Sequence, residues 1–341
     1  QDSLFLNAVQ AVTGSAFSLL IMGLWAVHFQ SAIFTLPVSN RSRAAPPPFP
    51  KIPKPPDQGV CTLDDYKEWI GKSMSTEALV TAYQADALNA TLDRDDPPFK
   101  EGDAIPPGWH LFYMREVVKL RDTATDGHPK RGDFLPPIPL PRRMWAGTHA
   151  TYHQPIRVGE KIRQVSTIEA VTPKTGKTGQ LVFLKLKHEI SGEDGPAASE
   201  SQDVVYREEA KPGAAAPEPP PAPGEAVWRR DIHPTPVLLF RYSALTMNSH
   251  RIHYDRTYAT EVEKYPGLLV HGPLTFTLLM DLFRRKMPAT TLKSFAVRAV
   301  SPLYDINNFS VEGAPNEDGA SATLWALNHQ GRLAMSAEAT F

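Results

Sequence analysis

The clearest hydrophobic pattern lies at residues 272–286, where a helix apolar on nearly all sides is expected. Leucine, phenylalanine and methionine dominate this segment until the basic residues 284–286 end it. A helix without a polar face belongs in the interior of a protein, and cations in its last turn suit the negative end of the helix dipole. Pro273 is tolerated in the first turn, because its missing N–H would have no partner there. The pattern therefore predicts a buried helix that begins near Gly272.

The segment before this helix is polar and rich in titratable groups. Residues 242–271 contain three histidines, His250, His253 and His271. Asp255 is placed to cap the first turn of a short helix that follows it. Polar, titratable side chains crowded between a predicted strand and a buried helix are unusual in a core, so they indicate a functional site.

Apolar and aromatic runs predict further elements in both halves of the chain. The expected strands are residues 148–156, 161–171, 180–190, 199–207, 237–242, 291–299, 307–313, 322–327 and 333–341. Helices are also expected over residues 256–262 and over residues 77–92, the latter capped by Ser75. These elements predict an α+β protein.

Two proline-rich stretches divide the chain. Its length of 341 residues suits two domains, and the composition of the two stretches is that of extended linkers. The expected organisation is an apolar segment over residues 1–40, a linker over residues 41–58, a first half over residues 59–210, a linker over residues 211–225 and a second half over residues 226–341.

The N-terminal segment contains a stretch without charged residues at 16–34, if His28 is neutral. Its length reaches the lower limit for a membrane-spanning helix. The arginines and lysines that follow it would place the rest of the chain on the cytoplasmic or matrix side. A membrane anchor, a cleaved targeting segment and a mistranslated exon remain the alternatives for this stretch.

Composition excludes several classes of protein. A net charge of −1 gives no electrostatic reason to bind nucleic acid. The single cysteine, Cys61, excludes an internal disulfide and suits a reducing compartment. His250 and His253 lack a third ligand at a regular spacing, so we expect no metal. No nucleotide-binding fingerprint is present, and no cofactor is expected.

The start of the buried helix is itself a possible binding site for negative charge. Backbone N–H groups at Gly272 would be free to donate to a ligand, and the helix dipole favours negative charge there. A developing oxyanion is such a charge. An imidazole titrates near neutral pH, so His253 is a candidate acid–base group beside it.

Residues 245–253, Leu-Thr-Met-Asn-Ser-His-Arg-Ile-His, and 269–272, Leu-Val-His-Gly, resemble two motifs of the MaoC-like hotdog hydratases and dehydratases. The resemblance implies the hotdog fold, a curved antiparallel sheet wrapped around one long helix. It also implies that His253 is the catalytic histidine and that the Gly272 N–H holds the thioester carbonyl.

Two positions depart from the family motif. Asn248 stands where the family has its catalytic aspartate, and His250 stands where it has an asparagine. An amide does not accept a proton, so Asn248 would only orient the water or hydroxyl. His253 would exchange protons, with Asp255 as a candidate for the carboxylate that Asn248 cannot supply. His250 and His271 are candidates for substrate contacts, with a structural role as the alternative. The motif at residues 245–253 is more similar to the branch of fungal mitochondrial hydroxyacyl-thioester dehydratase type 2 and mesaconyl-C4-CoA hydratase than to the bacterial single-hotdog hydratases. In that branch we expect this substitution to be normal.

A second stretch similar to that branch is Phe-Leu-Pro-Pro-Ile-Pro-Leu-Pro-Arg-Arg-Met-Trp-Ala-Gly at residues 134–147. So much proline is incompatible with a central strand, so an ordered loop or lid is predicted. Arg142 and Arg143 would bind the phosphates of a nucleotide thioester, with Trp145 against its ring. A surface arginine pair in a proline-braced loop is the equal alternative.

The expected protein is a double hotdog in which a degenerate first half pairs with a catalytic second half. The resemblance implies an (R)-3-hydroxyacyl-thioester dehydratase or 2-enoyl-thioester hydratase of fatty acid metabolism, acting on acyl-CoA or an acyl carrier protein in mitochondria. The alternatives are a mesaconyl- or itaconyl-CoA hydratase and a non-catalytic thioester-binding subunit. The two halves would pair within a monomer, or the chain would form a homodimer, with membrane contact through residues 16–34.

Overall fold

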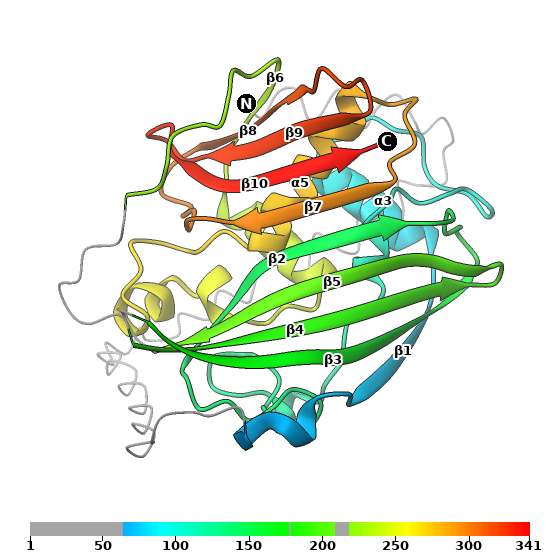
Figure 1. The fold of residues 1–341 in the computed structure, drawn as a ribbon. Coiled ribbons are helices and arrows are strands. Elements are labelled where there is room, and N and C mark those ends of the chain that lie inside the picture. Colours follow the sequence, from blue (N-terminus) through cyan, green and yellow to red (C-terminus); the bar gives the residue numbers. More distant parts are fainter. Residues whose placement is uncertain (1–63, 177–178, 209–217) are drawn as a thin grey trace, which may run out of the picture. The chain divides into compact units, whose positions relative to one another are not determined.

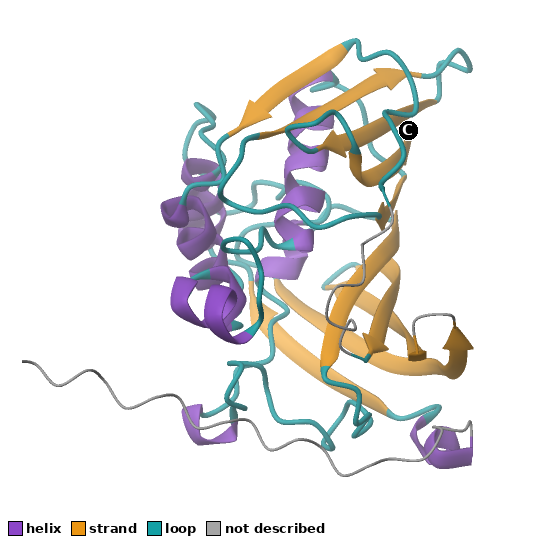
Figure 2. Ribbon diagram, turned by 90° about the vertical axis from the view of Figure 1, so that its left-hand side faces the viewer, coloured by secondary structure: helices purple, strands orange, loops and turns teal. Residues whose placement is uncertain are grey.

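The computed structural model describes residues 64–176, 179–208 and 218–341. These residues form one ten-stranded antiparallel sheet in the order β1-β3-β4-β5-β2-β7-β10-β9-β8-β6. Most of the helices lie on one face of this sheet (Figures 1 and 2). Within this part of the chain, no helix is both long and apolar enough to cross a membrane.

In each half an edge strand is followed by helices and then by the other strands. The first half contains η1 (Asp64–Trp69), β1 (Ser73–Leu79), α3 (Ala82–Thr91), η2 (Trp109–Phe112), η3 (Leu120–Asp122), β2 (Arg142–Tyr152), β3 (Lys161–Gly176), β4 (Gly179–Gly192) and β5 (Gly195–Arg207). The second half contains β6 (Trp228–Ile232), α4 (Pro236–Leu245), η4 (Arg251–His253), η5 (Tyr258–Val262), α5 (Gly272–Lys286), β7 (Ser294–Ala299), β8 (Phe309–Pro315), β9 (Ser321–Leu327) and β10 (Leu333–Thr340).

Helix α5 is the central helix of the second half, and the prediction of a buried helix at residues 272–286 is confirmed. Every residue from 274 to 283 is buried. The helix packs on β6, β8, β9 and β10 and reaches β2 of the first half. Burial of its apolar side chains accounts for this position, because a helix with apolar residues on most sides is stable in water only when it is enclosed.

The two halves share one sheet and one core. Strand β2 pairs with β7 from Gly147 opposite Arg298 to Thr151 opposite Ser294. A Cβ atom at Gly147 would lie 2.4 Å from the Val297 carbonyl oxygen, so the close approach of the strands requires glycine. A single cluster of buried apolar side chains runs from α3 to α5. The halves therefore pair within the chain.

The strand predicted at residues 237–242 is wrong, because this segment lies in helix α4. The Thr235 hydroxyl oxygen accepts a hydrogen bond from the Leu238 N–H at 3.2 Å, and Pro236 occupies the first turn. Leu239 and Tyr242 are buried, whereas Phe240 is exposed. That spacing is helical, so a local cap and a one-sided apolar face determine the structure.

The helix predicted at residues 77–92 is correct only in its second part. Residues 73–79 form β1, which pairs with β3 and alternates between exposed and half-buried side chains. Helix α3 begins at Ala82. The loop predicted at residues 134–147 is likewise wrong from Arg142 onward, because β2 begins there, directly after the last proline.

The remaining strand predictions are confirmed, and the short strand β6 was not predicted. Several predicted segments lie outside the described residues. They are the N-terminal segment 1–40 with its uncharged stretch 16–34, the linker 41–58 and residues 211–217 of the second linker.

Candidate active site

Three histidines of the second half stand in a row beside the first turn of α5. The His253 ring stacks on the His271 ring with centroids 3.7 Å apart. The His250 ring meets the His253 ring edge to face at 5.5 Å. His271 is the N-cap residue of α5, so the row leads directly to the backbone N–H groups of that helix.

A tightly bonded loop after α4 holds this row in place. Met247 adopts a left-handed backbone conformation with φ 48°. The Asn248 side-chain oxygen accepts from the His250 N–H at 3.1 Å. Asp255 caps the next helix by accepting from the Tyr258 N–H at 3.0 Å, as predicted. Its other oxygen is 2.7 Å from Arg251, so the Asp255 carboxylate is engaged in fixing the loop.

His253 has the geometry of a general base. Its Nδ1 lies 2.7 Å from the Leu269 carbonyl oxygen, which accepts, so Nδ1 carries the proton of the neutral ring. The lone pair of Nε2 is then available to accept a proton. Burial lowers the pKa of His253 to about 4, so the ring is neutral at pH 7.

The His271 ring packs against the face of the His253 ring. Its Nε2 shares a hydrogen bond of 2.8 Å with the Ser243 hydroxyl, and burial holds its pKa well below the usual value. Its Nδ1 is buried with no hydrogen-bond partner among the described residues. The fully buried ring and its stacking on His253 suit a positioning role for His271.

Gly272 and Trp145 meet at the start of α5. A Cβ atom at Gly272 would lie 2.8 Å from Cε3 of the Trp145 ring, so only glycine fits there. The Trp145 indole N–H donates to the Thr148 hydroxyl at 3.0 Å. A side chain of the first half therefore packs against the helix end that the sequence singled out.

The two arginines before Trp145 differ in their surroundings. Arg142 forms an ion pair with Glu263 and donates to the Tyr265 hydroxyl at 2.9 Å. Burial and the neighbouring His128 and His253 lower the pKa of His250, and the charge of Arg143 contributes in the same direction. The structure gives Arg142 a partner within the protein, whereas Arg143 acts on the histidine row through its charge.

Two residues beside the histidine row were not predicted, Asp126 and His128. The His128 ring lies 3.9 Å from the His250 ring, and its Nδ1 is 3.0 Å from an Asp126 carboxylate oxygen. Both stand between η3 and β2, far along the chain from the motif they approach. An Asp-Gly-His-Pro turn was visible in the sequence, but nothing local relates it to His250.

The possibility of a metal ion concerns the same group. Among the described residues, Asp126, His128 and His250 form the one set of three potential donors within 4.8 Å of one another. The carboxylate already pairs with a ring nitrogen of His128, and the two rings lie face against face, tilted by 42°. A metal needs lone pairs aimed at a common point, so this arrangement favours proton exchange over coordination.

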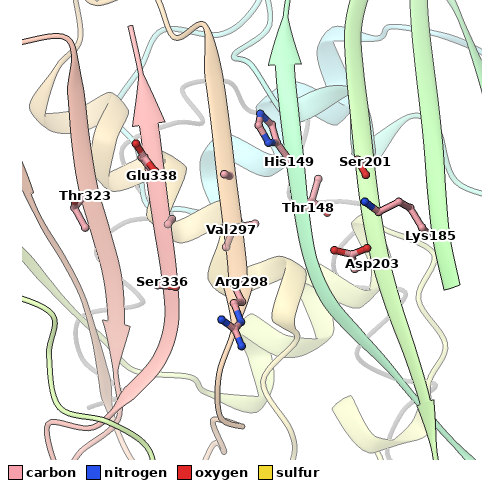
Figure 3. A pocket seen from close by; sticks show the side chains of 12 residues that line it. Thr148, His149, Lys185, Ser201, Asp203, Val297, Arg298, Thr323, Ser336 and Glu338 are labelled. Atoms are coloured by element: carbon pink, nitrogen blue, oxygen red, sulfur yellow. The ribbon is translucent and has the colours of Figure 1, made fainter. Parts of the chain in front are cut away.

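A separate groove of about 630 Å³ crosses the other face of the sheet (Figure 3). Lys185, Asp203, Arg298 and Glu338 contribute polar side chains to it. In this view the helices lie behind the strands. The groove is therefore distinct from the histidine row, which belongs to the helical face.

A double hotdog with an imidazole at the N-terminus of its buried helix defines the class, a thioester hydratase or dehydratase. The chain belongs to the family of hydroxyacyl-thioester dehydratase type 2, which it matches over residues 108–305. It is 41% identical over 276 residues to mesaconyl-C(4)-CoA hydratase of Chloroflexus aurantiacus, covering 80% of this chain and 96% of that protein. It is 27% identical to mitochondrial hydroxyacyl-thioester dehydratase type 2 of Schizosaccharomyces pombe, covering 59% and 75%.

Solved structures share the fold at low sequence identity. A MaoC-like dehydratase of Phytophthora capsici superposes with a TM-score of 0.60 and 13% identity, covering 82% of this chain and 99% of that one. HtdX of Mycobacterium tuberculosis gives a TM-score of 0.53 and 16% identity, covering 78% and 98%. The MaoC-like family and the double-hotdog α+β fold expected from the sequence are confirmed, and the chain is a hydro-lyase acting on thioesters.

Proposed function

We propose that the chain interconverts (R)-3-hydroxyacyl thioesters and 2-enoyl thioesters, with His253 as the acid–base group. The observation that carries this assignment is the bond between His253 Nδ1 and the Leu269 carbonyl. It fixes the tautomer and leaves a basic Nε2 beside the N-terminus of α5.

In dehydration, His253 Nε2 takes the proton from Cα of the substrate. Negative charge then develops on the thioester oxygen, where the Gly272 N–H and the dipole of α5 stabilise it. The Asn248 oxygen is occupied by the His250 N–H, which leaves its NH₂ group to donate to the substrate hydroxyl. The C–O bond at Cβ then breaks with its electron pair on oxygen, and the departing hydroxide takes up a proton to form water.

The test is turnover of crotonyl-CoA by the full chain, followed as loss of the enoyl-thioester absorbance. General acid–base catalysis contributes about 10²–10⁴-fold, so we expect His253→Ala to lower kcat by at least about 100-fold. His329→Ala, at an exposed histidine, is the matched control. Wild-type turnover by a folded His253→Ala variant would rule out the assignment.

A short acyl group with a second carboxylate is the second candidate substrate. The interior of the first half contains a polar cluster, in which His110 lies 2.9 Å from Glu200 and His188 is bonded to Ser166 at 2.8 Å. Long alkyl chains bind to apolar walls. Arg115 carries a buried Nε with no partner among the described residues, and its charge acts on Glu200 and on His271.

The relative from Chloroflexus, named for mesaconyl-C(4)-CoA, supports this candidate. Comparison of kcat/KM for mesaconyl-CoA, crotonyl-CoA and a long-chain 2-enoyl-CoA tests it. Preference for mesaconyl-CoA that Arg115→Leu reverses would establish a carboxylate-bearing substrate. Preference for the long chain would return the assignment to fatty acid metabolism.

We also propose a mitochondrial location, which rests on the relative from Schizosaccharomyces pombe, and an acyl-CoA or acyl carrier protein thioester as the partner. Contact with a membrane through residues 16–34 is a further proposal about a segment outside the described residues. Fractionation of cells that express the full tagged chain, with alkaline extraction of the membranes, tests location and attachment together.

A further inference from the structure

The proposed dehydration involves two protons, and His253 accounts for one of them. One proton leaves Cα, and another must reach the hydroxyl as it departs from Cβ. The Asn248 amide can orient that hydroxyl, but it does not supply a proton at neutral pH. The Asp255 carboxylate is paired with Arg251. A second acid close to the histidine row would supply the proton to the hydroxyl while His253 takes the one from Cα.

A turn from the first half brings a carboxylate–imidazole pair to this place. The Ala124 N–H donates to the His128 carbonyl oxygen at 2.7 Å and closes the turn. One Asp126 carboxylate oxygen accepts from the His128 backbone N–H at 2.9 Å, and the other lies 3.0 Å from Nδ1 of the same residue. Asp126 thus fixes both the backbone and the ring of His128.

The turn is fitted closely to the loop that carries the histidines. The Arg251 N–H donates to the Asp126 carbonyl oxygen at 2.9 Å. Gly127 has φ +91°, and a Cβ atom there would lie 1.8 Å from the Ser249 carbonyl oxygen. A side chain at position 127 would separate the two segments. The placement of His128 against His250 is therefore built into the backbone of both halves.

We propose that His128, held by Asp126, is the second acid–base group and exchanges its proton with the Cβ hydroxyl, which rests on the proposed function. In dehydration the Cα–H bond breaks and its proton goes to His253. The C–O bond at Cβ breaks with its electron pair on oxygen, and the His128 imidazolium gives that oxygen a proton to form water. Solvent then returns the proton from His253 to His128.

The surroundings of the two imidazoles suit these separate roles. Burial lowers the pKa of both rings. Among the described side chains, Asp126 hydrogen-bonds to His128 and favours its charged form, whereas His253 bonds to a neutral carbonyl. Different environments of this kind separate an acid from a base. The charged or titratable groups that face His128 are Asp126, which favours the imidazolium, and Arg131, Arg143, His250 and His253, which oppose it.

The test is the pH profile of kcat/KM for dehydration of an (R)-3-hydroxyacyl-CoA by the full chain. Asp126→Asn keeps an oxygen for the His128 N–H but removes the negative charge. We expect at least a tenfold loss and a shift of the alkaline limb to lower pH, because His128 then loses its proton more easily. His128→Gln should lower activity by about 10²-fold or more and abolish that limb. Asp122→Asn, an exposed carboxylate beside the same turn, should match the parent.

A rescue variant separates catalysis from structure. Asn248→Asp places a carboxylate at the histidine row. Added to His128→Gln, it should raise the activity at least tenfold above that of His128→Gln alone. A folded His128→Gln protein without any such rescue would indicate a structural role and would overturn the inference. Parent-like pH profiles in Asp126→Asn and His128→Gln would overturn it too, while an inactive His253→Ala still supported the proposed function. Loss of parent activity with a chelator, reversed by zinc, would also overturn it in favour of a metal site.

Discussion

Burial sets the chemistry of single residues at this site. His253 is enclosed by protein, and burial lowers its pKa to about 4. The ring is therefore neutral at pH 7, and its free nitrogen can accept a proton. Its tautomer depends on one carbonyl, that of Leu269. Gly272 contributes by having no side chain, which lets the Trp145 ring and the helix end approach each other. Small changes of position at these residues should therefore have large effects on rate.

Gly272→Ala tests the close contact at the start of α5. The added Cβ would lie 2.8 Å from a carbon of the rigid Trp145 ring, so the helix end or the ring must move. We expect roughly a 10–100-fold loss of kcat, since displacement by about 1 Å can cost that much. The measurement is kcat with crotonyl-CoA. Gly224→Ala, where nothing lies within 4 Å of the added atom, is the control, and recovery in Gly272→Ala with Trp145→Leu would confirm the contact as the cause.

At the residue scale, the sequence located positions where the chemistry is local, and the catalytic roles of these residues stay predictions. His253 and Gly272 stand in short motifs beside a recognisable helix, and the structure places both at the start of that helix. Asp126 and His128 were not predicted, because the relation of their turn to His250 depends on backbone contacts between distant segments. The roles predicted for Asn248, His250, His271, Arg142, Arg143 and Trp145 stay predictions.

At the scale of elements, helix α5 is anchored as well as buried. Asp281, on this helix, is 2.7 Å from Arg94, 2.8 Å from Arg230 and 2.7 Å from Arg285. Arg94 follows α3 in the first half, and Arg230 lies in β6. One buried carboxylate therefore ties the central helix to an edge strand and to the other half of the protein.

Asp281→Ala should destabilise the fold strongly. Removing one partner of a buried ion pair leaves the others without compensation and costs about 3–5 kcal/mol. Because the arginines keep some contact with solvent, we expect the lower end, roughly 3 kcal/mol. Urea unfolding followed by circular dichroism measures it. Glu317→Ala, an exposed carboxylate in the turn after β8, should change stability by less than about 0.5 kcal/mol. Equal stability of the two variants would show that the arginines are solvated.

The errors at the scale of elements have a common cause. Short apolar runs such as residues 237–242 have no unique period, so strand and helix compete until packing selects one. Thr235 and Pro236 were a helix-start signal that favoured α4. Residues 73–79 form a strand because β3 offers a partner edge along their whole length. That edge is provided by residues almost a hundred positions later, which no local pattern contains.

In the described part of the molecule, the pairing of β2 with β7 joins the two halves. It makes one sheet from two halves, and the shared core and the Arg94–Asp281 pair reinforce it. The candidate site depends on the junction as well, since Trp145 and the Asp126–His128 turn come from one half and His253 from the other.

A chain cut between the halves should stay assembled and active. We would replace residues 211–216 with a protease site and cleave the folded protein. The two fragments should elute together and keep crotonyl-CoA hydration, because the described residues of the two halves share one sheet and one core. An uncleaved sample of the same variant is the control. Separation into two folded fragments would contradict this and would support independent modules.

The sequence by itself determined the buried helix at residues 272–286, most of the strands and the family, because each rests on neighbours along the chain. The roles of His253 and Gly272 rest on local motifs as well and stay predictions. Tertiary structure alone decided that residues 237–242 are helical, that β2 meets β7, and that Asp126 and His128 reach the histidine row. These features arise from burial and from hydrogen bonds between segments distant in sequence, and their free energy exists only once the chain has brought those segments together.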